Sequence, residues 1–161
     1  MSARPEPALE AVLDVVVELG DLVDHGTTRS GHRRVIPILG GTMRGLGRFA
    51  SILPSAQIER GGADWQVVRP DGAIDVDTRY TARTPQGALI YLQTSGVRTG
   101  SAEILAALGR GEIVDPASYY FRLLVRFETS ALDLQELEHG LFIASAARDA
   151  GRVTYTVYRV G

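Results

Sequence analysis

The sequence contains neither cysteine nor lysine, and each absence removes a class of chemistry. Without Cys there is no disulfide, no thiolate nucleophile, no thiolate zinc site and no iron–sulfur cluster. Without Lys there is no Schiff base, no pyridoxal-phosphate anchor and no P-loop lysine. We therefore expect any catalysis to use carboxylates, His, Tyr, Ser, Thr, Arg or backbone groups, and to need no cofactor.

Charge and hydropathy exclude two further kinds of partner. The chain has a net charge of −2, and its 17 basic residues, all Arg, are spread along the sequence. Phosphate contacts need a basic face, so we expect no nucleic-acid partner. No apolar run approaches the roughly 20 residues of a membrane span, and residues 1–10 lack the hydrophobic core of a signal peptide. These features predict a cytoplasmic protein with no membrane partner.

The length predicts one domain with a substantial core. A chain of 161 residues buries roughly 70% of its extended surface on folding. We expect a disordered N-terminal lead over residues 1–10 and a single domain over residues 11–161.

Segments that alternate apolar and polar residues dominate the rest of the chain. Residues 73–83 alternate most cleanly, with Ile74 and Val76 on one face and Asp75 and Asp77 on the other. The predicted strands cover residues 12–19, 33–39, 43–53, 64–69, 73–83, 87–96, 119–129, 140–148 and 152–160. We predict an all-β fold, a single antiparallel β-barrel of about eight to ten strands with one short helix, because closure removes exposed edges. A sandwich is the alternative.

The predicted helix follows Ser101, a suitable N-cap residue. Ile104, Leu105 and Leu108 form an apolar stripe at helical spacing, and Gly109 and Gly111 supply the stop.

Neither a metal site nor a phosphate loop has a convincing pattern. The three His residues, His25, His32 and His139, lack the spacing of metal ligands, so we predict no metal. An oxygen-ligand site at Asp75 and Asp77 stays open, and the alternative there is simple ion pairing with Arg.

The glycines from Gly40 to Gly47 precede no capped helix. We interpret Gly40-Gly41 as a strand bend of the kind needed at a barrel corner.

The predicted strand over residues 119–129 carries polar groups on one face. Tyr120, Arg122, Arg126 and Glu128 share that face, whereas the other face is apolar. One interpretation is a solvated ladder of cross-strand ion pairs. The other is a polar wall inside a pocket, where Arg grips an oxygen and Glu128 acts as a base.

Two other segments are candidate functional positions. Trp65, the only Trp, follows Asp64 after a Gly-Gly pair, which suits either a core plug or a stacking surface beside a carboxylate.

The run from Glu136 to His139 combines carboxylates with His on a predicted loop. It is either simply exposed or an acid/base cluster, because nearby carboxylates raise the pKa of His.

The stretches that carry a family resemblance are 33–38, 40–42, 61–66, 69–72, 79–81, 87–91, 115–116, 119–122, 126–129, 141–142 and 157–160. Taken together, they resemble the bacterial and fungal family called domain of unknown function 3237. The resemblance covers about residues 12–161 and implies a small antiparallel β-barrel with no established general reaction. Two departures stand out: residues 55–60 look inserted, and the run from Glu136 to Gly140 replaces an aromatic-Leu-Asn-Arg pattern. A specialised member recruited to secondary metabolism is one hypothesis for the second departure.

These observations lead to one functional prediction and two alternatives. We predict a cofactor-free enzyme of the cyclase, isomerase or hydratase/lyase type, acting on a hydrophobic small molecule with carbonyl or phenol groups. A non-catalytic carrier with the same cavity and a structural dimerisation module are the alternatives, and a homodimer stays open. The candidate catalytic residues are Asp64, Glu128 and His139, and the candidate ligand-binding residues are Trp65, Arg79, Tyr80, Arg98, Tyr120, Arg122 and Arg126.

Overall fold

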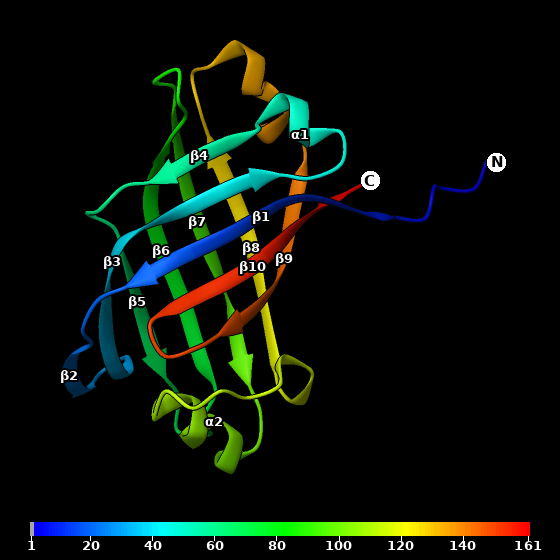
Figure 1. Cartoon of the computed structure of the whole chain (residues 1–161). Coiled ribbons are helices and arrows are strands. Elements are labelled where there is room, and N and C mark those ends of the chain that lie inside the picture. Colours follow the sequence, from blue (N-terminus) through cyan, green and yellow to red (C-terminus); the bar gives the residue numbers. More distant parts are fainter. Residues whose placement is uncertain (1) are drawn as a thin grey trace.

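The computed structural model describes residues 2–161, and most of the chain is antiparallel strand (Figure 1). Four short helical segments join the strands: α1 (Phe49–Ile52), α2 (Ala102–Gly109), and the 3-10 turns η1 (Pro116–Ser118) and η2 (Leu132–Leu137). The strands are β1 (Leu9–Leu19), β2 (Val23–Thr28), β3 (Gly31–Gly45), β4 (Ser55–Ile58), β5 (Ala63–Val68), β6 (Ile74–Arg83), β7 (Leu89–Thr99), β8 (Tyr120–Glu128), β9 (Leu141–Arg148) and β10 (Arg152–Val160).

The strands close into a barrel, as the sequence predicts. Pairing runs from β1 through β10, β9, β8, β7 and β6 to β4 and β3, and β3 pairs again with β1. The ten strands occupy eight positions around the barrel, because β4 and β5 share one position and β2 only extends β3 as a hairpin. The predicted barrel is therefore confirmed, and the alternative, a sandwich, is excluded.

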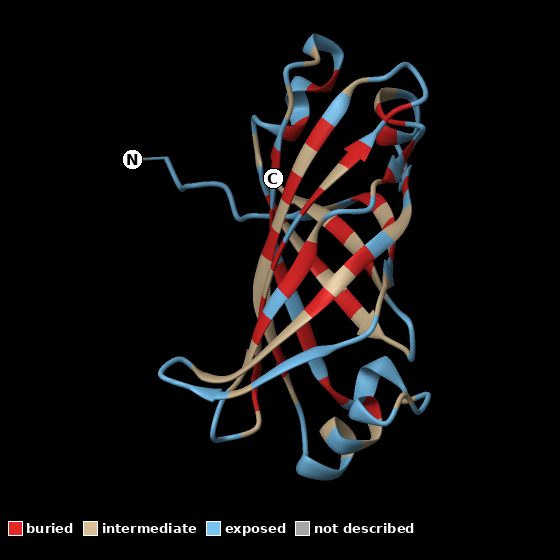
Figure 2. Cartoon of the chain, turned by 90° about the vertical axis from the view of Figure 1, so that its left-hand side faces the viewer, coloured by how far each residue is buried: buried red, intermediate tan, exposed pale blue. Residues whose placement is uncertain are grey.

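The two-residue period of the strands decides which side chains fill the barrel. In β6 the buried residues are every second one from Ile74 to Ala82, and in β8 they are Phe121, Leu123, Val125 and Phe127. Figure 2 shows this alternation of buried and exposed positions along the strands. Apolar side chains from all sides of the barrel therefore meet in one interior core.

The Gly40-Gly41 bend is confirmed. Gly41 has φ +145°, and a Cβ there would lie 2.0 Å from the carbonyl oxygen of Val16 on the neighbouring strand. The register between β1 and β3 shifts at this point, where Glu18 faces Gly40 and Leu19 faces Ile38. Only glycine permits this close approach, so the Gly40-Gly41 pair lets β3 bend. Before the bend β3 pairs with β5, and after it β3 pairs with β4.

The two ends of the barrel differ in chemistry. At the end that carries α1 and η2, the side chains of Phe49, Leu53, Leu134 and Leu137 are almost fully buried and form an apolar plug. At the opposite end lies α2 with the connection from β7 to β8 (Figure 1). The polar interior residues described below lie toward this α2 end.

Several local predictions need correction. Residues 43–53 are not all strand: β3 ends at Gly45, Gly47 adopts φ +53°, and the chain turns into α1. The polar stretch after β1 forms β2, the region that looks inserted forms β4, and β1 starts at Leu9, inside the predicted lead.

The predicted helix is confirmed as α2. Its N-cap, Ser101, accepts a hydrogen bond of 3.2 Å from the backbone N–H of Ile104.

Among residues 2–161, no helix is long and apolar enough to cross a membrane.

Candidate functional site

A small pocket lies inside the barrel and combines apolar walls with buried charged groups. Its volume is about 30 Å³, which is room for one or two water molecules. Its apolar walls come from five strands, β1, β3, β6, β8 and β10, and its charged groups lie toward the α2 end. The lining residues are Val17, Leu19, Ile38, Asp64, Val76, Thr78, Tyr80, Thr94, Arg98, Phe121, Leu123, Arg148, Val153 and Tyr155.

Asp64 is the carboxylate of this pocket. The alternation of β5 turns Asp64 and Gln66 inward and Trp65 outward, and Asp64 is only 8% exposed. Its Oδ2 accepts a hydrogen bond of 2.7 Å from the Gln66 amide, and its Oδ1 accepts one of 3.2 Å from the backbone N–H of Asp77. Burial nevertheless raises the pKa of Asp64, because loss of hydration outweighs these hydrogen bonds.

Arg98 is the most deeply buried cation among residues 2–161. It is 4% exposed and lies over the ring of Phe121, with its Cζ 5.3 Å from the ring centroid. Its Nε has no hydrogen-bond partner within residues 2–161. Burial and the neighbouring Arg148 lower the pKa of Arg98 to about 10, so the guanidinium is still charged at neutral pH.

Arg148 and Arg34 add two more guanidiniums to the same region. Burial and repulsion by Arg34 lower the pKa of Arg148, whose Nε donates 3.1 Å to the carbonyl of Asp149. Arg34 donates a hydrogen bond of 2.5 Å from Nη2 to the Gln66 carbonyl, while its Nε has no partner among the described residues. Within residues 2–161, no side-chain ion pair joins Asp64 to any of these three arginines.

Hydroxyl groups line the deeper part of the pocket. The phenol groups of Tyr80 and Tyr155 are hydrogen-bonded to each other, and so are the hydroxyls of Thr78 and Thr94. Burial raises the pKa of both tyrosines, so both phenols are protonated at neutral pH. They can donate or accept a hydrogen bond, but they do not supply a base.

The structure brings together only part of the set predicted from the sequence. Asp64, Tyr80 and Arg98 line the interior pocket. The remaining seven lie elsewhere: Trp65, Arg79, Tyr120, Arg122, Arg126 and Glu128 are on the outer face of the barrel, and His139 is exposed beside η2 at the apolar end.

The outward orientation of the β8 set has a simple physical reason. Phe121, Leu123, Val125 and Phe127 fill the core, so the alternate residues face outward. There the Arg122 guanidinium lies over the ring of Tyr120, with its Cζ 5.2 Å from the centroid. The interpretation of Arg122, Arg126 and Glu128 as a polar wall of an interior pocket is therefore wrong, because these side chains face outward.

Sequence reasoning missed most of the polar interior, although the signal was present. Arg148 is in phase with the buried Phe142, Ala144 and Ala146 of β9. Tyr155 is in phase with the buried Val157 of β10. A charged or phenolic residue on the apolar face of an alternating strand is thus the pattern that identifies this pocket.

The open positions for metal binding have other partners. Among residues 2–161, no three His, Asp or Glu side chains gather as a metal site would require. Asp75 forms an ion pair with Arg69, and Asp77 lies 3.7 Å from Arg79, which is the ion-pairing alternative. His32 lies 2.6 Å from Asp24 in the β2–β3 hairpin.

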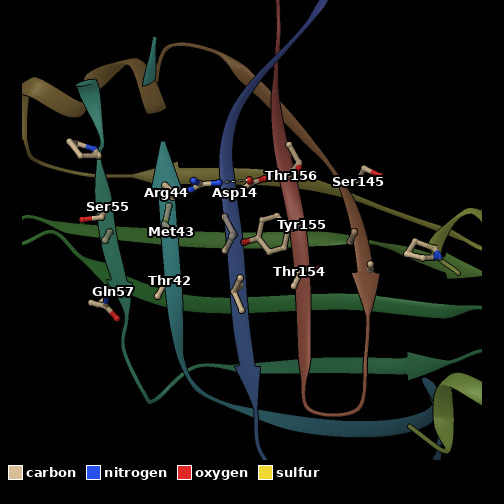
Figure 3. A pocket seen from close by; sticks show the side chains of 17 residues that line it. Asp14, Thr42, Met43, Arg44, Ser55, Gln57, Ser145, Thr154, Tyr155 and Thr156 are labelled. Carbon is tan, nitrogen blue, oxygen red and sulfur yellow. Dashed lines mark hydrogen bonds and ion pairs between the residues drawn. The ribbon is translucent and has the colours of Figure 1, made fainter. Parts of the chain in front are cut away.

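A larger hollow lies on the outer face, across β4, β3, β1, β10 and β9 (Figure 3). Its volume is about 690 Å³, and Ser, Thr and Ala side chains form much of its floor. The charged groups shown there already bind each other: Arg44 donates 3.2 Å to Asp14, which also accepts 2.8 Å from Thr156. The interior pocket, with buried and unpaired groups, is therefore the stronger candidate despite its smaller volume.

Comparison with known proteins identifies a family rather than an activity. A family model described as "Protein of unknown function (DUF3237)" matches residues 7–160. A UPF0311 protein from Rhodopseudomonas palustris is 41% identical over 156 residues, covering 96% of this chain and 98% of the relative.

Two solved structures have a similar fold. A conserved protein of unknown function from Rhodopseudomonas palustris has a TM-score of 0.89 at 39% identity, covering 99% of this chain and 100% of the other. A Penicillium herquei protein, described as an enzyme, has a TM-score of 0.69 at 17% identity, covering 100% of both chains, a likeness of fold alone.

Proposed function

Because the chain belongs to the DUF3237 family, whose description assigns no activity, we propose its function from the site: a small-molecule-binding barrel that acts as a cofactor-free acid/base enzyme. The reaction is a cyclisation, an isomerisation, or the addition or elimination of water. The substrate is a hydrophobic compound with a carbonyl or phenol group. The fold is compatible with catalysis, since the Penicillium herquei protein of similar fold is described as an enzyme.

The observation that carries this proposal is the position of Asp64. A carboxylate that is 8% exposed, with a raised pKa, faces the pocket with the guanidiniums of Arg98 and Arg148 nearby. A general base works best when its pKa approaches the working pH, and burial moves Asp64 in that direction. Arg98 and Arg148 remain charged and can stabilise negative charge on an oxygen, but they are poor proton donors.

The proposed reaction starts with the same proton transfer in an isomerisation, a cyclisation and an elimination of water, and the addition of water is the reverse of the elimination. Asp64 removes a proton from the carbon next to a carbonyl group, and the C–H electron pair moves onto the carbonyl oxygen as an enolate. Arg98 and Arg148 stabilise that oxyanion.

In an isomerisation Asp64 returns the proton to another carbon of the substrate. In an elimination the C–O bond breaks and the departing hydroxyl takes the proton and leaves as water. In a cyclisation the enolate carbon attacks a second carbonyl group, whose oxygen takes the proton. Each route restores the carboxylate.

Substrate entry requires the barrel interior to open. A volume of about 30 Å³ is far below the several hundred Å³ of usual ligand pockets. The half-buried residues of the lining, Leu19, Arg148 and Val153, lie toward the α2 end, whereas the other end has its apolar plug. Side-chain displacement at the α2 end is therefore the proposed route of entry.

Hydrogen exchange of a neutral hydrophobic ketone tests the proposal. Phenylacetone is incubated with the protein in D₂O, and loss of its α-proton signals is followed by NMR. We expect the protein to accelerate exchange, and Asp64→Asn to slow it by about 100-fold or more. Glu128→Gln, a matched change on the outer face, should leave the rate unchanged.

Two outcomes contradict the enzyme. No acceleration over buffer removes catalysis by this site, and an equal loss in Asp64→Asn and Glu128→Gln removes the role of Asp64. Binding of phenylacetone without exchange favours the alternative, a non-catalytic carrier that uses the same pocket.

A further inference from the structure

We propose that the interior pocket binds its ligand through a carboxylate group, so that the natural substrate is a hydrophobic carboxylic acid in its anionic form. The inference rests on the proposed function in placing the substrate in this pocket. It adds the chemical class of the group that is recognised there.

The first argument is the charge balance at the α2 end of the interior. Arg98 and Arg148 line the pocket and Arg34 lies close by, whereas Asp64 is the only acidic side chain of the lining. Asp24 and Asp149 also attract Arg34 and Arg148, but these carboxylates lie outside the lining and form ion pairs with His32 and Arg152. Each arginine repels at least one of the others, and none forms a side-chain ion pair within residues 2–161. Buried cations are normally paired, so this excess indicates a missing anion.

The second argument is the pair of unused hydrogen-bond donors. The Nε atoms of Arg34 and Arg98 are both buried and both lack a partner among the described residues. Arg98 is the decisive case, because it is 4% exposed and lines the pocket directly. An unmade hydrogen bond from a buried charged donor is costly. A carboxylate matches the planar donor edge of a guanidinium, to which it can bind through both oxygens.

The third argument is the rest of the lining, which favours an organic acid over an inorganic anion. Val17, Leu19 and Val153 form apolar walls beside the guanidiniums, and the Phe121 ring lies against Arg98. The hydroxyls of the lining are already hydrogen-bonded in pairs, Tyr80 with Tyr155 and Thr78 with Thr94. The apolar walls offer no donor to the outer oxygens of a phosphate, whereas they suit the hydrocarbon part of an acid. The cavity of about 30 Å³ has room for a planar head group of the acid before the rest of the interior opens.

The test follows the Nε–H signal of Arg98 by ¹⁵N NMR in the full chain, at constant ionic strength. The probes are benzoate, its neutral isostere benzamide, and inorganic phosphate. We expect benzoate to shift the Arg98 signal and to slow its exchange with water, and benzamide to leave it unchanged. Phosphate should bind more weakly than benzoate.

Variants separate specific binding from general attraction to a cationic protein. Arg98→Met and Arg148→Met should each weaken benzoate binding by about tenfold or more, measured by calorimetry. The matched variant Arg126→Met on the outer face of β8 should bind as the parent does. If one pocket variant does not fold, the other gives the same comparison.

The inference and the proposed function fail in different ways. Equal binding of benzoate and benzamide, no change at Arg98, or tighter binding of phosphate overturns the carboxylate class, whatever happens to phenylacetone exchange. Conversely, Asp64→Asn should keep or strengthen benzoate binding, because it removes a negative charge, while it slows phenylacetone exchange by about 100-fold or more. Loss of benzoate binding in Asp64→Asn contradicts the charge argument.

Discussion

The side-chain amide of Gln66 donates a hydrogen bond of 2.7 Å to Oδ2 of Asp64 inside the barrel. The orientation of that amide is set from its other side, because the Gln66 carbonyl accepts a hydrogen bond of 2.5 Å from Arg34. The N–H donor of Gln66 favours ionisation of Asp64, and the same side chain links Asp64 to the half-buried guanidinium of Arg34. It acts on the candidate base as a positioning residue without lining the pocket itself.

Gln66→Met should raise the pKa of Asp64 further. Burial raises the pKa of Asp64, and the hydrogen bond from Gln66 lowers it. Without that hydrogen bond, less remains to counteract the increase in pKa that burial causes. The measurement is an NMR titration of the Asp64 carboxyl carbon in the parent and the variant. Gln93→Met, on the outer face of β7, is the control and should leave the titration unchanged. An unchanged or lower pKa in Gln66→Met contradicts this role.

Arg98→Met should stabilise the fold by about 1 kcal/mol at neutral pH. The fall in pKa from 12.5 to about 10 corresponds to a cost of about 3 kcal/mol. Loss of the contact with the Phe121 ring offsets about 2 kcal/mol of that gain. Because the folded pKa lies below the unfolded one, the cost persists at all pH values below about 10 and declines only above it.

Denaturant unfolding at pH 7 and pH 8 should therefore show the same gain for Arg98→Met at both values. The matched variant Arg126→Met should change the free energy of unfolding by less than about 0.5 kcal/mol. A loss of stability in Arg98→Met would mean that the guanidinium has a partner that compensates its burial.

The hydrogen bond between Tyr80 and Tyr155 should appear as a coupling energy. Tyr155→Phe leaves the buried hydroxyl of Tyr80 without its partner, at a cost of about 1–3 kcal/mol. The double variant Tyr80→Phe/Tyr155→Phe removes both polar groups and should cost about 1 kcal/mol less than the sum of the single variants. Additive losses in this double-mutant cycle contradict a direct hydrogen bond.

Gly41→Ala should destabilise the barrel strongly. The new Cβ would lie 2.0 Å from the Val16 carbonyl, and the backbone has φ +145°. We expect a loss of at least about 2 kcal/mol in the free energy of unfolding. Gly151→Ala is the control, since nothing lies within 4 Å of a Cβ there. Equal effects of the two substitutions would remove Gly41 as the cause of the bend.

The barrel itself could be predicted because local patterns and the global fold agree. The alternation in β6 and the cap at Ser101 follow from neighbouring residues alone. The sequence predicts a strand over residues 49–52, whereas the structure has α1 (Phe49–Ile52) there. Phe49 and Leu53 are apolar in either a strand or a helix, and their burial at the end of the barrel decides for the helix.

The site was only partly predictable for a different reason. Asp64, Tyr80 and Arg98 could be identified as chemically capable residues, but the face of each strand that points inward depends on closure of the whole barrel. In β8 the charged face looked functional, yet Phe121 and Phe127 take the interior. Gln66 and Arg148 become visible as site residues only when β5 and β9 lie across the same interior.

The most direct test of the account is the pH–rate profile of phenylacetone exchange for the protein and for Asp64→Asn. The base must be ionised, so the rate should rise with pH, with an apparent pKa above the ordinary value of 3.8 because burial raises the pKa of Asp64. That rising limb should be absent in Asp64→Asn and unchanged in Glu128→Gln. A limb that persists in Asp64→Asn would contradict Asp64 as the base and the interior pocket as the functional site.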